Sequence, residues 1–284
     1  MKLLNSFFQR YVIILLVSIV LLSSMVLVNS QNPQEVCPSK CKLDIAFALD
    51  VSGSMSGQPL DDLKEATTTF INMTCPDCQW SIGLVAFNDT AINLTYLGSP
   101  SNGVLYPVCT EENKTTLRNI IYTLNAGGWT NIGDAIYNAT AMILNSDRPD
   151  ANNILIIVTD GSPNRPLNVP DPEEYAREAA DYAKSLGIVI VGIYVGDATE
   201  DGDEFLLSIS SSPQHFINAS IQSNINMSDA FLILFNRLCE LSEVKVGGEV
   251  EISTIDSSNN LIYMITGYIA VISIVSVLII KKNK

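Results

Sequence analysis

The stretch LDIAFALDVSGS, residues 43–54, decides the fold of this chain. Its first part is apolar except for Asp44, as expected for a central strand that is covered on both faces of a parallel sheet. Its second part is a loop of small and polar residues in which Asp50 is followed by Ser52 and Ser54. Ligands of open α/β sheets bind at the carboxyl ends of the strands. The stretch therefore predicts a buried strand that ends in a polar site.

Apolar strands and amphipathic helices alternate along the rest of the chain. We expect strands at 43–50, 79–87, 91–97, 153–160, 188–195 and 215–218, and helices at 60–73, 111–124, 132–144, 173–186, 204–211 and 226–241. This alternation predicts an α/β fold with a doubly wound, mostly parallel six-stranded sheet. The segment 91–97 follows a tight hairpin and is expected as the one antiparallel edge strand. One such sheet occupies residues 43–240, which leaves no room for a second domain.

The N-terminal end resembles a targeting segment. Residues 1–30 place Lys2 and Arg10 before the apolar run 11–22 and end in short polar residues, a pattern typical of a secretory signal peptide. An uncleaved anchor helix is the alternative interpretation of the same run. Residues 31–42 then form a leader that contains two cysteines.

The C-terminal end predicts a membrane anchor. Residues 261–280 carry no charge, and a helix of this length spans about 30 Å, the thickness of the bilayer hydrocarbon. The tail at 281–284 holds three lysines, which favours the cytoplasmic side. The polar segment 241–260 is expected to be a short stalk. We expect a single-pass type I protein of the cell membrane, with one transmembrane helix and an extracellular domain.

Glycosylation sequons and cysteines also fit an extracellular domain. There are seven N-x-S/T sequons, at Asn72, Asn88, Asn93, Asn113, Asn138, Asn218 and Asn226. The six cysteines, an even number, are Cys37, Cys41, Cys75, Cys78, Cys109 and Cys239. The strand directions place all six at the end of the sheet opposite the polar loops, where disulfides are expected. A redox motif at Cys75-Pro-Asp-Cys78 and a zinc site formed by the first four cysteines are less favoured alternatives.

Charge and composition exclude several classes of function. The chain carries 30 acidic and 16 basic residues, a formal net charge of −14, and such a surface repels phosphate backbones and anionic lipid. Nucleic-acid binding is therefore not expected. The single histidine, His215, rules out chemistry that needs two imidazoles.

Three polar stretches are expected to meet at one edge of the sheet. Asp50, Ser52 and Ser54 follow the first strand, Asp160 ends the strand at 153–160, and Thr130 lies in the loop that opens the helix at 132–144. Together they supply two carboxylates and three hydroxyls. Oxygen donors with few charges suit Mg²⁺, with Mn²⁺ or Ca²⁺ as alternatives. Without a metal, Asp50 and Ser52 would simply form a turn and a helix cap.

These stretches resemble the metal-ion-dependent adhesion site of von Willebrand factor A domains, the family that includes integrin I domains. The likeness lies in Asp50-x-Ser52-x-Ser54, in Thr130 within GGWTNIG and in Asp160 within VTDG, and it extends over the whole predicted domain. The resemblance implies a Rossmann-like fold. It implies that Ser52 and Ser54 bind the ion directly, Thr130 directly or through water, and the two aspartates largely through water. A protein partner's Asp or Glu carboxylate would complete the coordination.

The resemblance also bears on the cysteines. It favours a bridge from Cys41, or Cys37, to Cys239 in the last helix. Cys109 is then expected to pair with one of the two cysteines in the turn 75–78. In integrin-type relatives the last helix slides downward to raise affinity. A bridge at Cys239 would tether that helix, so large switching is expected to be restrained.

The predicted function is cell-surface adhesion or ligand recognition through the bound ion, without enzymatic activity. Met55, Gln58, Trp129 and Arg165 are expected to frame the surface that a matrix or cell-surface partner contacts. Trp129 is the candidate apolar hot spot, and packing against the neighbouring loop is its alternative role. One alternative function is a structural or self-associating surface protein that binds without metal. The other is a Mg²⁺-dependent hydrolase with Asp50 as nucleophile, which is disfavoured because Arg165 is the only basic residue predicted at the rim to clamp a phosphate and its loop is expected to shape the partner surface instead.

Overall fold

The computed structural model describes residues 41–96, 98–196, 202–220 and 223–242. All of them belong to one compact unit, Met1–Val246. The predicted signal peptide, nearly all of the stalk, the transmembrane helix, the cytoplasmic tail and Cys37 lie outside the described residues. Within the described ranges, no helix is both long and apolar enough to cross a bilayer.

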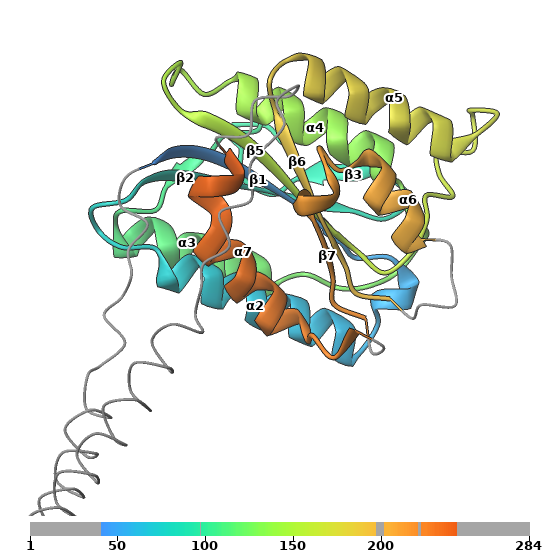
Figure 1. Cartoon of the computed structure of the whole chain (residues 1–284), viewed down its shortest axis with the longest axis horizontal. Coiled ribbons are helices and arrows are strands. Elements are labelled where there is room, and N and C mark those ends of the chain that lie inside the picture. The colour runs from blue at the N-terminus through green and yellow to red at the C-terminus, as the bar shows by residue number, and fades with distance from the viewer. Residues whose placement is uncertain (1–40, 97, 197–201, 221–222, 243–284) are drawn as a thin grey trace, which may run out of the picture. The chain divides into compact units, whose positions relative to one another are not determined.

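A seven-stranded sheet forms the centre of the domain, with helices on both faces (Figure 1). Its strands are β1 (Lys42–Asp50), β2 (Gln79–Phe87), β3 (Ala91–Asn93), β4 (Tyr106–Pro107), β5 (Asn152–Thr159), β6 (Val189–Tyr194) and β7 (Phe216–Asn218). Its helices are α2 (Gln58–Met73), α3 (Glu111–Tyr122), α4 (Ile132–Leu144), α5 (Pro172–Ser185), α6 (Gly202–Ile209) and α7 (Met227–Ser242). Two short 3-10 turns, η1 (Gly53–Met55) and η2 (Pro213–His215), complete the order.

The strand order is β3-β2-β1-β5-β6-β7, and β4 also pairs with β2. Strands β1, β2, β5, β6 and β7 run parallel, which confirms the predicted mostly parallel α/β sheet. The predicted antiparallel edge beside β2 is present, but it consists of two short strands, β3 and β4, that pair with different parts of β2, so the sheet has seven strands instead of six. All parallel strands therefore end at the same edge of the sheet.

The side chain of Thr95 explains why the predicted strand 91–97 is divided. Its hydroxyl accepts the N–H of Leu84 at 3.0 Å and donates to the carbonyl of Val104 at 2.7 Å. The hydroxyl thus takes the place of a backbone carbonyl in the ladder to β2. The chain leaves the sheet there and returns to it only at β4, a substitution that strand periodicity alone does not reveal.

The alternation of β1 sends different side chains to the two faces. Leu43, Ile45, Phe47 and Leu49 join a core with α2, α3 and α7. In this core three aromatic rings pack edge-on against Phe70 and the ring of Trp80 stacks on it. On the other face, β1 contributes only alanines between its two aspartates, and α4, α5 and α6 cover it largely with alanine and isoleucine. Small residues let these helices approach the sheet closely. Figure 1 shows the two helical layers on opposite sides of the sheet.

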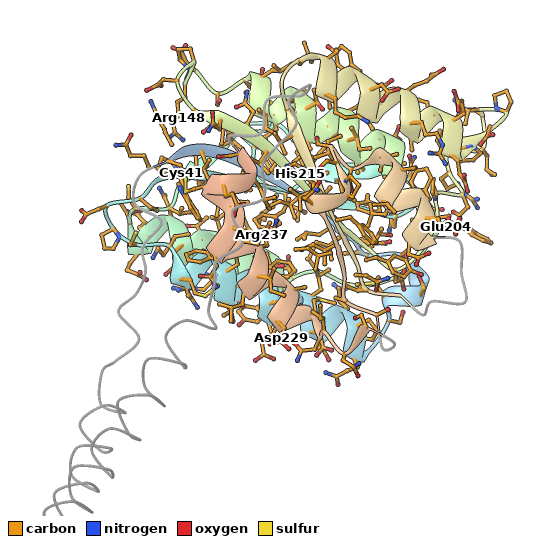
Figure 2. The ribbon with its side chains drawn as sticks, viewed as in Figure 1. Cys41, Arg148, Glu204, His215, Asp229 and Arg237 are labelled. Carbon is orange, nitrogen blue, oxygen red and sulfur yellow. A yellow bond between two sulfur atoms is a disulfide. The ribbon has the colours of Figure 1, made fainter. Side chains whose placement is uncertain are left out.

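We call the edge with the carboxyl ends of the parallel strands the rim and the opposite edge the base. Figure 2 shows Cys41 and Arg148 at the base and Glu204 toward the rim. At the base, Asp44 is fully buried and pairs with Arg148, whose guanidinium also donates to Ser81 and to the carbonyl of Gln79. This network holds the first residues of β1 and β2 to the segment after α4.

A disulfide joins Cys41 to Cys239 across 198 residues, with their Cα atoms 5.6 Å apart. It confirms the predicted bridge from the leader to the last helix and selects Cys41 over Cys37. Cys75 is also disulfide-bonded, whereas Cys78 and Cys109 carry free thiols. The chain therefore enters and leaves the described domain at one point of the base.

Candidate metal centre

The loop after β1 is organised by the carboxylate of Asp50. This residue is fully buried; its Oδ1 accepts the N–H of Ser52 at 2.7 Å and its Oδ2 accepts the hydroxyl of Thr159 at 2.6 Å. The first bond closes a turn of the kind expected for Asp and Ser in these positions. The second bond ties the end of β1 to the end of β5, so Asp50 fixes the relative position of two loops at the rim.

The serines of the first loop reach the loop after β5. The hydroxyls of Ser52 and Ser54 are 3.0 Å apart, and Ser54 donates its hydroxyl to Oδ1 of Asp160 at 2.8 Å. Side chains that are 106 residues apart in sequence are thus in direct contact. Four of the five predicted ligand side chains, including Asp50, are connected through these two loops.

The loop that carries Thr130 contacts both of the others through its backbone. The N–H of Gly53 donates to the carbonyl of Gly128 at 3.0 Å, and the carbonyl of Thr130 accepts the N–H groups of Asn164 and Arg165 at 2.9 and 3.2 Å. Gly128 has φ +82°, and a Cβ there would lie 2.5 Å from the carboxylate of Asp89, so a side chain is excluded. The close approach of this loop therefore depends on glycine.

The three loops surround an open cleft of about 660 Å³ at the rim. Its lining includes Ser52, Ser54, Thr130, Trp129, Gly161 and Glu173. The five predicted ligands thus converge, and Thr130 and the two serines open onto the same space. Three neighbouring residues that the sequence analysis did not single out also shape the site: Thr159, Asn164 and Glu173. Of these three, only Thr159 had a signal in the sequence that could have identified it, because it directly precedes the predicted ligand Asp160.

Burial makes the site electrostatically unfavourable without a counter-charge. Burial is the main reason that the pKa of Asp50 is raised to about 7; the negative charge of Asp160 also acts to raise this pKa, while hydrogen bonds from Thr159 and Ser52 oppose the change. A cation between the two carboxylates would relieve both effects. The hydroxyl of Ser162, next to Gly161 in the cleft wall, is also buried without a hydrogen-bond partner among the described residues.

The donor set fits a hard divalent ion. Two carboxylates and three hydroxyls are oxygen ligands of low total charge, which suits an ion that keeps some of its water. In the part of the chain that the structure describes, no three His, Cys, Asp or Glu side chains gather as a metal-binding group. The predicted site would not produce such a group, because hydroxyls supply three of its five ligands.

The residues expected at the partner surface divide into exposed and buried ones. Trp129 is 54% exposed, and the guanidinium carbon of Arg165 lies 4.3 Å from its ring centroid. Arg165 also pairs with Asp89 at 3.6 Å. Gln58 is exposed and donates to Asp62 at 2.6 Å. Met55, by contrast, is fully buried in the core, so the expectation that it faces a partner is corrected.

Residues 44–229 match the family model of the von Willebrand factor type A domain. The chain belongs to the von Willebrand factor type A family. Its A domain is 27% identical over 170 residues to the collagen alpha-4(VI) chain of Mus musculus, a match that covers 59% of this chain but only 6% of the collagen chain. The chain thus spans a small part of this relative.

Solved structures share the fold of this A domain. The pilus adhesin SpaC of Lactobacillus rhamnosus GG has a TM-score of 0.55 at 16% identity, covering 72% of this chain and 31% of the adhesin. Proximal thread matrix protein 1 from the mussel byssus, solved with zinc in its MIDAS motif, has a TM-score of 0.51 at 20% identity, covering 70% and 47%. At these identities the likeness establishes the α/β fold.

Proposed function

We propose that this chain is a cell-surface adhesion or ligand-recognition protein whose A domain binds an acidic residue of a protein partner through a divalent cation, Mg²⁺ in the first instance. Asp50, Ser52, Ser54, Thr130 and Asp160 would hold the ion at the rim. The observation that carries the proposal is the contact of Ser54 with both Ser52 and Asp160, at 3.0 and 2.8 Å, beside an open cleft. When bound, the cation supplies the positive charge that a partner's carboxylate requires.

Charge supports an ion-dependent mode of binding. The chain carries a net charge of −14, and Glu173 lines the cleft, so an acidic partner would be repelled by the protein alone. Arg165 is the nearby basic group, and its pairing with Asp89 reduces its effect. A cation at the five oxygen ligands would reverse the local sign of the field.

The partner surface would combine the ion with one aromatic contact. Trp129 projects beside the cleft and is held by the stacked guanidinium of Arg165. Exposed tryptophans and arginines at the centre of an interface are the residues most often responsible for binding energy. We infer that Trp129 packs against the partner next to the acidic residue that reaches the ion.

The named relatives favour recognition over catalysis. A collagen chain, a pilus adhesin and a thread matrix protein are structural or adhesive proteins by name, and one of them holds zinc at the corresponding motif. Zinc therefore joins Mg²⁺, Mn²⁺ and Ca²⁺ among the ions to test. We do not propose a hydrolase, because Arg165 is engaged by Trp129 and Asp89 instead of facing the cleft as a phosphate clamp.

The location remains a proposal drawn from the ends of the chain. A signal peptide at 1–30 and a transmembrane helix at 261–280 would place the A domain outside a single-pass type I membrane protein. Protease digestion of intact cells should then remove the domain while sparing the membrane segment. Retention of an intact, protected chain would contradict this topology.

The metal site is tested by titrating the purified full-length chain with Mg²⁺ in a calorimeter and with Mn²⁺ by electron paramagnetic resonance. We expect one ion per chain that EDTA removes. Asp160→Ala should weaken binding by at least about tenfold, or about 1.4 kcal/mol. The matched control is Asp147→Ala, which removes an exposed carboxylate from the segment after α4. Equal binding by both variants would contradict the assignment.

A pull-down from matrix and cell-surface extracts separates the proposal from its alternative. The exposed Trp129 and Leu167, 54% and 78% exposed, favour a second candidate in which the protein associates without metal. Partners that need the ion should be captured in Mg²⁺ and lost both in EDTA and with Asp160→Ala. Partners retained under all three conditions would support metal-free association instead.

A further inference from the structure

Two free thiols lie at the base of the domain, and neither serves the metal site. Cys78 is buried and Cys109 is exposed, and they are the cysteines without a disulfide among the described residues. Cys41, Cys75 and Cys239 already take part in disulfides. Cys78 directly precedes β2, and one residue, Val108, separates Cys109 from the end of β4.

The register of β2 and β4 brings the two cysteines together. Ser81 pairs with Pro107, and the N–H of Val108 donates to the carbonyl of Trp80 at 3.1 Å, which extends the antiparallel ladder by one step. The next step places Gln79 opposite Cys109, so Cys78 is one residue away. Opposite Cα atoms about 5 Å apart and a rise of about 3.4 Å per residue separate the two cysteines by about 6 Å, inside the range of disulfides.

The direction of the Cys78 side chain is not dictated by the pleat of β2. Its N–H donates to the carbonyl of Cys75 at 3.1 Å, so Cys78 closes a turn before the strand begins. Cys109, at the other end of the pair, is exposed and has room to change its rotamer. Strict strand alternation would otherwise point the two sulfurs to opposite faces.

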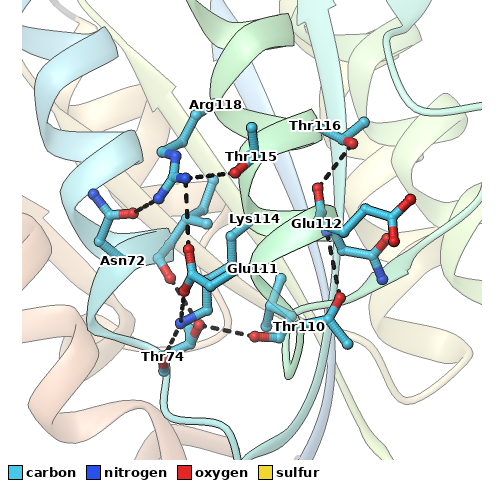
Figure 3. Close-up of polar contacts among 12 residues, drawn as sticks. Asn72, Thr74, Thr110, Glu111, Glu112, Lys114, Thr115, Thr116 and Arg118 are labelled. Carbon is cyan, nitrogen blue, oxygen red and sulfur yellow. Dashed lines mark hydrogen bonds and ion pairs between the residues drawn. The ribbon is translucent and has the colours of Figure 1, made fainter.

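The two sulfurs share one electrostatic environment. Burial is the main cause that raises the pKa of Cys78, and the charge of Cys109 raises it as well, while the ammonium of Lys114 lowers it. Lys114 is buried, donates to the carbonyl of Thr74 and pairs with Glu111 at 3.6 Å, as Figure 3 shows. Burial outweighs the ammonium, so the pKa of Cys78 stays raised and the exposed Cys109 is the better placed thiol to begin an exchange with an oxidant.

We propose that Cys78 and Cys109 form a further disulfide of this chain in an oxidising compartment. The oxidant is a disulfide of the glutathione class or of a thiol-disulfide oxidoreductase. The exposed thiolate of Cys109 attacks one sulfur of that disulfide and releases the other as a thiol. The thiolate of Cys78 then attacks the sulfur of Cys109 and releases the second thiol. Two protein thiols lose two electrons and two protons, and one disulfide is reduced to two thiols.

This bridge would close a loop that contains β2, β3 and β4. Between β3 and β4, this loop has as contacts the hydrogen bonds of the Thr95 hydroxyl and an isolated bridge from Tyr96 to Gly103. Closing the loop reduces the freedom of the unfolded chain, which is how disulfides chiefly stabilise proteins. The inference is independent of the metal site, and its test does not require an ion or a partner.

The test counts thiols in the full-length chain after incubation in a buffer of reduced and oxidised glutathione of secretory-pathway composition. The chain is unfolded without reductant and alkylated, and its peptides are identified by mass spectrometry. We expect no alkylation at Cys78 or Cys109, and a peptide pair joined through them that is 2 Da lighter than the two thiol peptides together. The Cys41–Cys239 peptide pair serves as the internal reference for complete oxidation.

One variant and one treatment of the parent protein keep the test decisive. Cys109→Ser should leave Cys78 as a thiol that is alkylated only after unfolding, and it should lower Tm by about 5–10 °C relative to the oxidised parent. Reduction of the parent should lower Tm at least as much. Alkylation of both cysteines while Cys41–Cys239 is intact would overturn the proposal. So would a peptide that links Cys109 to a second copy of the chain, seen as a dimer on a non-reducing gel.

Discussion

The rim and the base of this A domain are held together in different ways. At the rim, single hydrogen bonds between hydroxyls, carboxylates and backbone groups join three loops around an open cleft. At the base, a disulfide and a buried ion pair join elements that are far apart in sequence. At the rim, Ser54 is exposed beside the cleft, whereas at the base the carboxylate of Asp44 is fully buried and paired with Arg148. The base is thus cross-linked by the protein's own groups, whereas the rim leaves an open cleft.

Helix α7 connects the two regions, and its last turn is held three times. Besides the disulfide at Cys239, His215 Nε2 bonds to the carbonyl of Leu241 at 3.1 Å, and Asn152 donates to the hydroxyl of Ser242 at 3.1 Å. A helix fixed in this way resists sliding along its axis. We expect the rim to bind its ligand without a large displacement of α7.

Of the changes that test this difference between rim and base, removing the Cys41–Cys239 disulfide should have the largest effect on the free energy of unfolding. In the double variant Cys41→Ser, Cys239→Ser, the free energy of unfolding should fall by about 3–5 kcal/mol, because a very long loop is no longer closed. Chemical denaturation measures the loss. If α7 is restrained by the bridge, Mn²⁺ affinity and partner capture should also change in the variant or under reductant. Unchanged binding in both cases would remove the restraint from the mechanism.

Breaking the ion pair between Asp44 and Arg148 at the base should have the second-largest effect on the free energy of unfolding. Arg148→Met leaves the carboxylate of Asp44 buried without its partner, and the free energy of unfolding should fall by about 3–4 kcal/mol. The control is Lys42→Met, which breaks the exposed pair with Asp150 and should cost only a small part of that loss. Equal effects of the two variants in urea denaturation would show that the buried pair has no special weight.

Acid should weaken the base through His215. Burial is the main cause that lowers the pKa of this histidine below its usual 6.5, and the charge of Arg237 lowers it further, while the bond to Leu241 opposes both. Because the carbonyl of Leu241 accepts from Nε2, the neutral ring carries its proton there and Nδ1 accepts from Ser212. Figure 2 shows His215 and Arg237 near each other.

The sign of the pH effect follows from that lowered pKa. Well above pH 6.5 the histidine is neutral in both the folded and the unfolded state and contributes no slope. As the pH falls below 6.5, the unfolded chain takes up a proton that the folded domain does not, so stability decreases until the folded pKa is passed. One proton limits the slope to about 1.4 kcal/mol per pH unit. The slope should be smaller in His215→Gln, and an unchanged slope would assign it to other groups.

The smallest effects are expected at the glycosylation sequons, because their asparagines differ in how exposed they are. Asn93 is buried and donates its amide to the carbonyl of Pro100 at 2.8 Å, so a glycan there would displace a native contact. Asn226 is exposed, and Asn72 is exposed with its carbonyl oxygen accepting from Arg118, as Figure 3 shows. Glycopeptide mapping should find sugar at Asn226 and Asn72 and none at Asn93. A glycan at Asn93 would contradict the burial of this side chain at the β3 edge of the sheet.

The parts of the fold that could be predicted are those with strong periodicity or fixed chemistry. The apolar run of β1 and its Asp50-x-Ser52-x-Ser54 continuation identified the central strand and the loop at its end, because a sheet brings strand ends together. The strand directions also placed the described cysteines correctly at the base. The resemblance to the family predicted a disulfide at Cys239, and the structure identifies Cys41 as its partner.

Other features depended on single contacts that leave no pattern in the sequence. The hydroxyl of Thr95 divides one predicted strand into two, and no periodicity marks that position. Met55 lies in a polar loop yet is buried, because η1 turns its side chain inward. The tie between Thr159 and Asp50 became visible only when β1 and β5 were adjacent. Such details require the tertiary arrangement.

The bridge between Cys41 and Cys239 also determines how the domain would carry a mechanical load. A pull applied to the C-terminal end of α7 would pass through two sulfur atoms into the start of β1 before the helix could be peeled from the sheet. Strand β1 lies between β2 and β5 and is paired in parallel with both along most of its length. If the proposed ligand and the proposed membrane anchor are both present, tension between them would act along the central strand, which can slip only if both ladders shear at once.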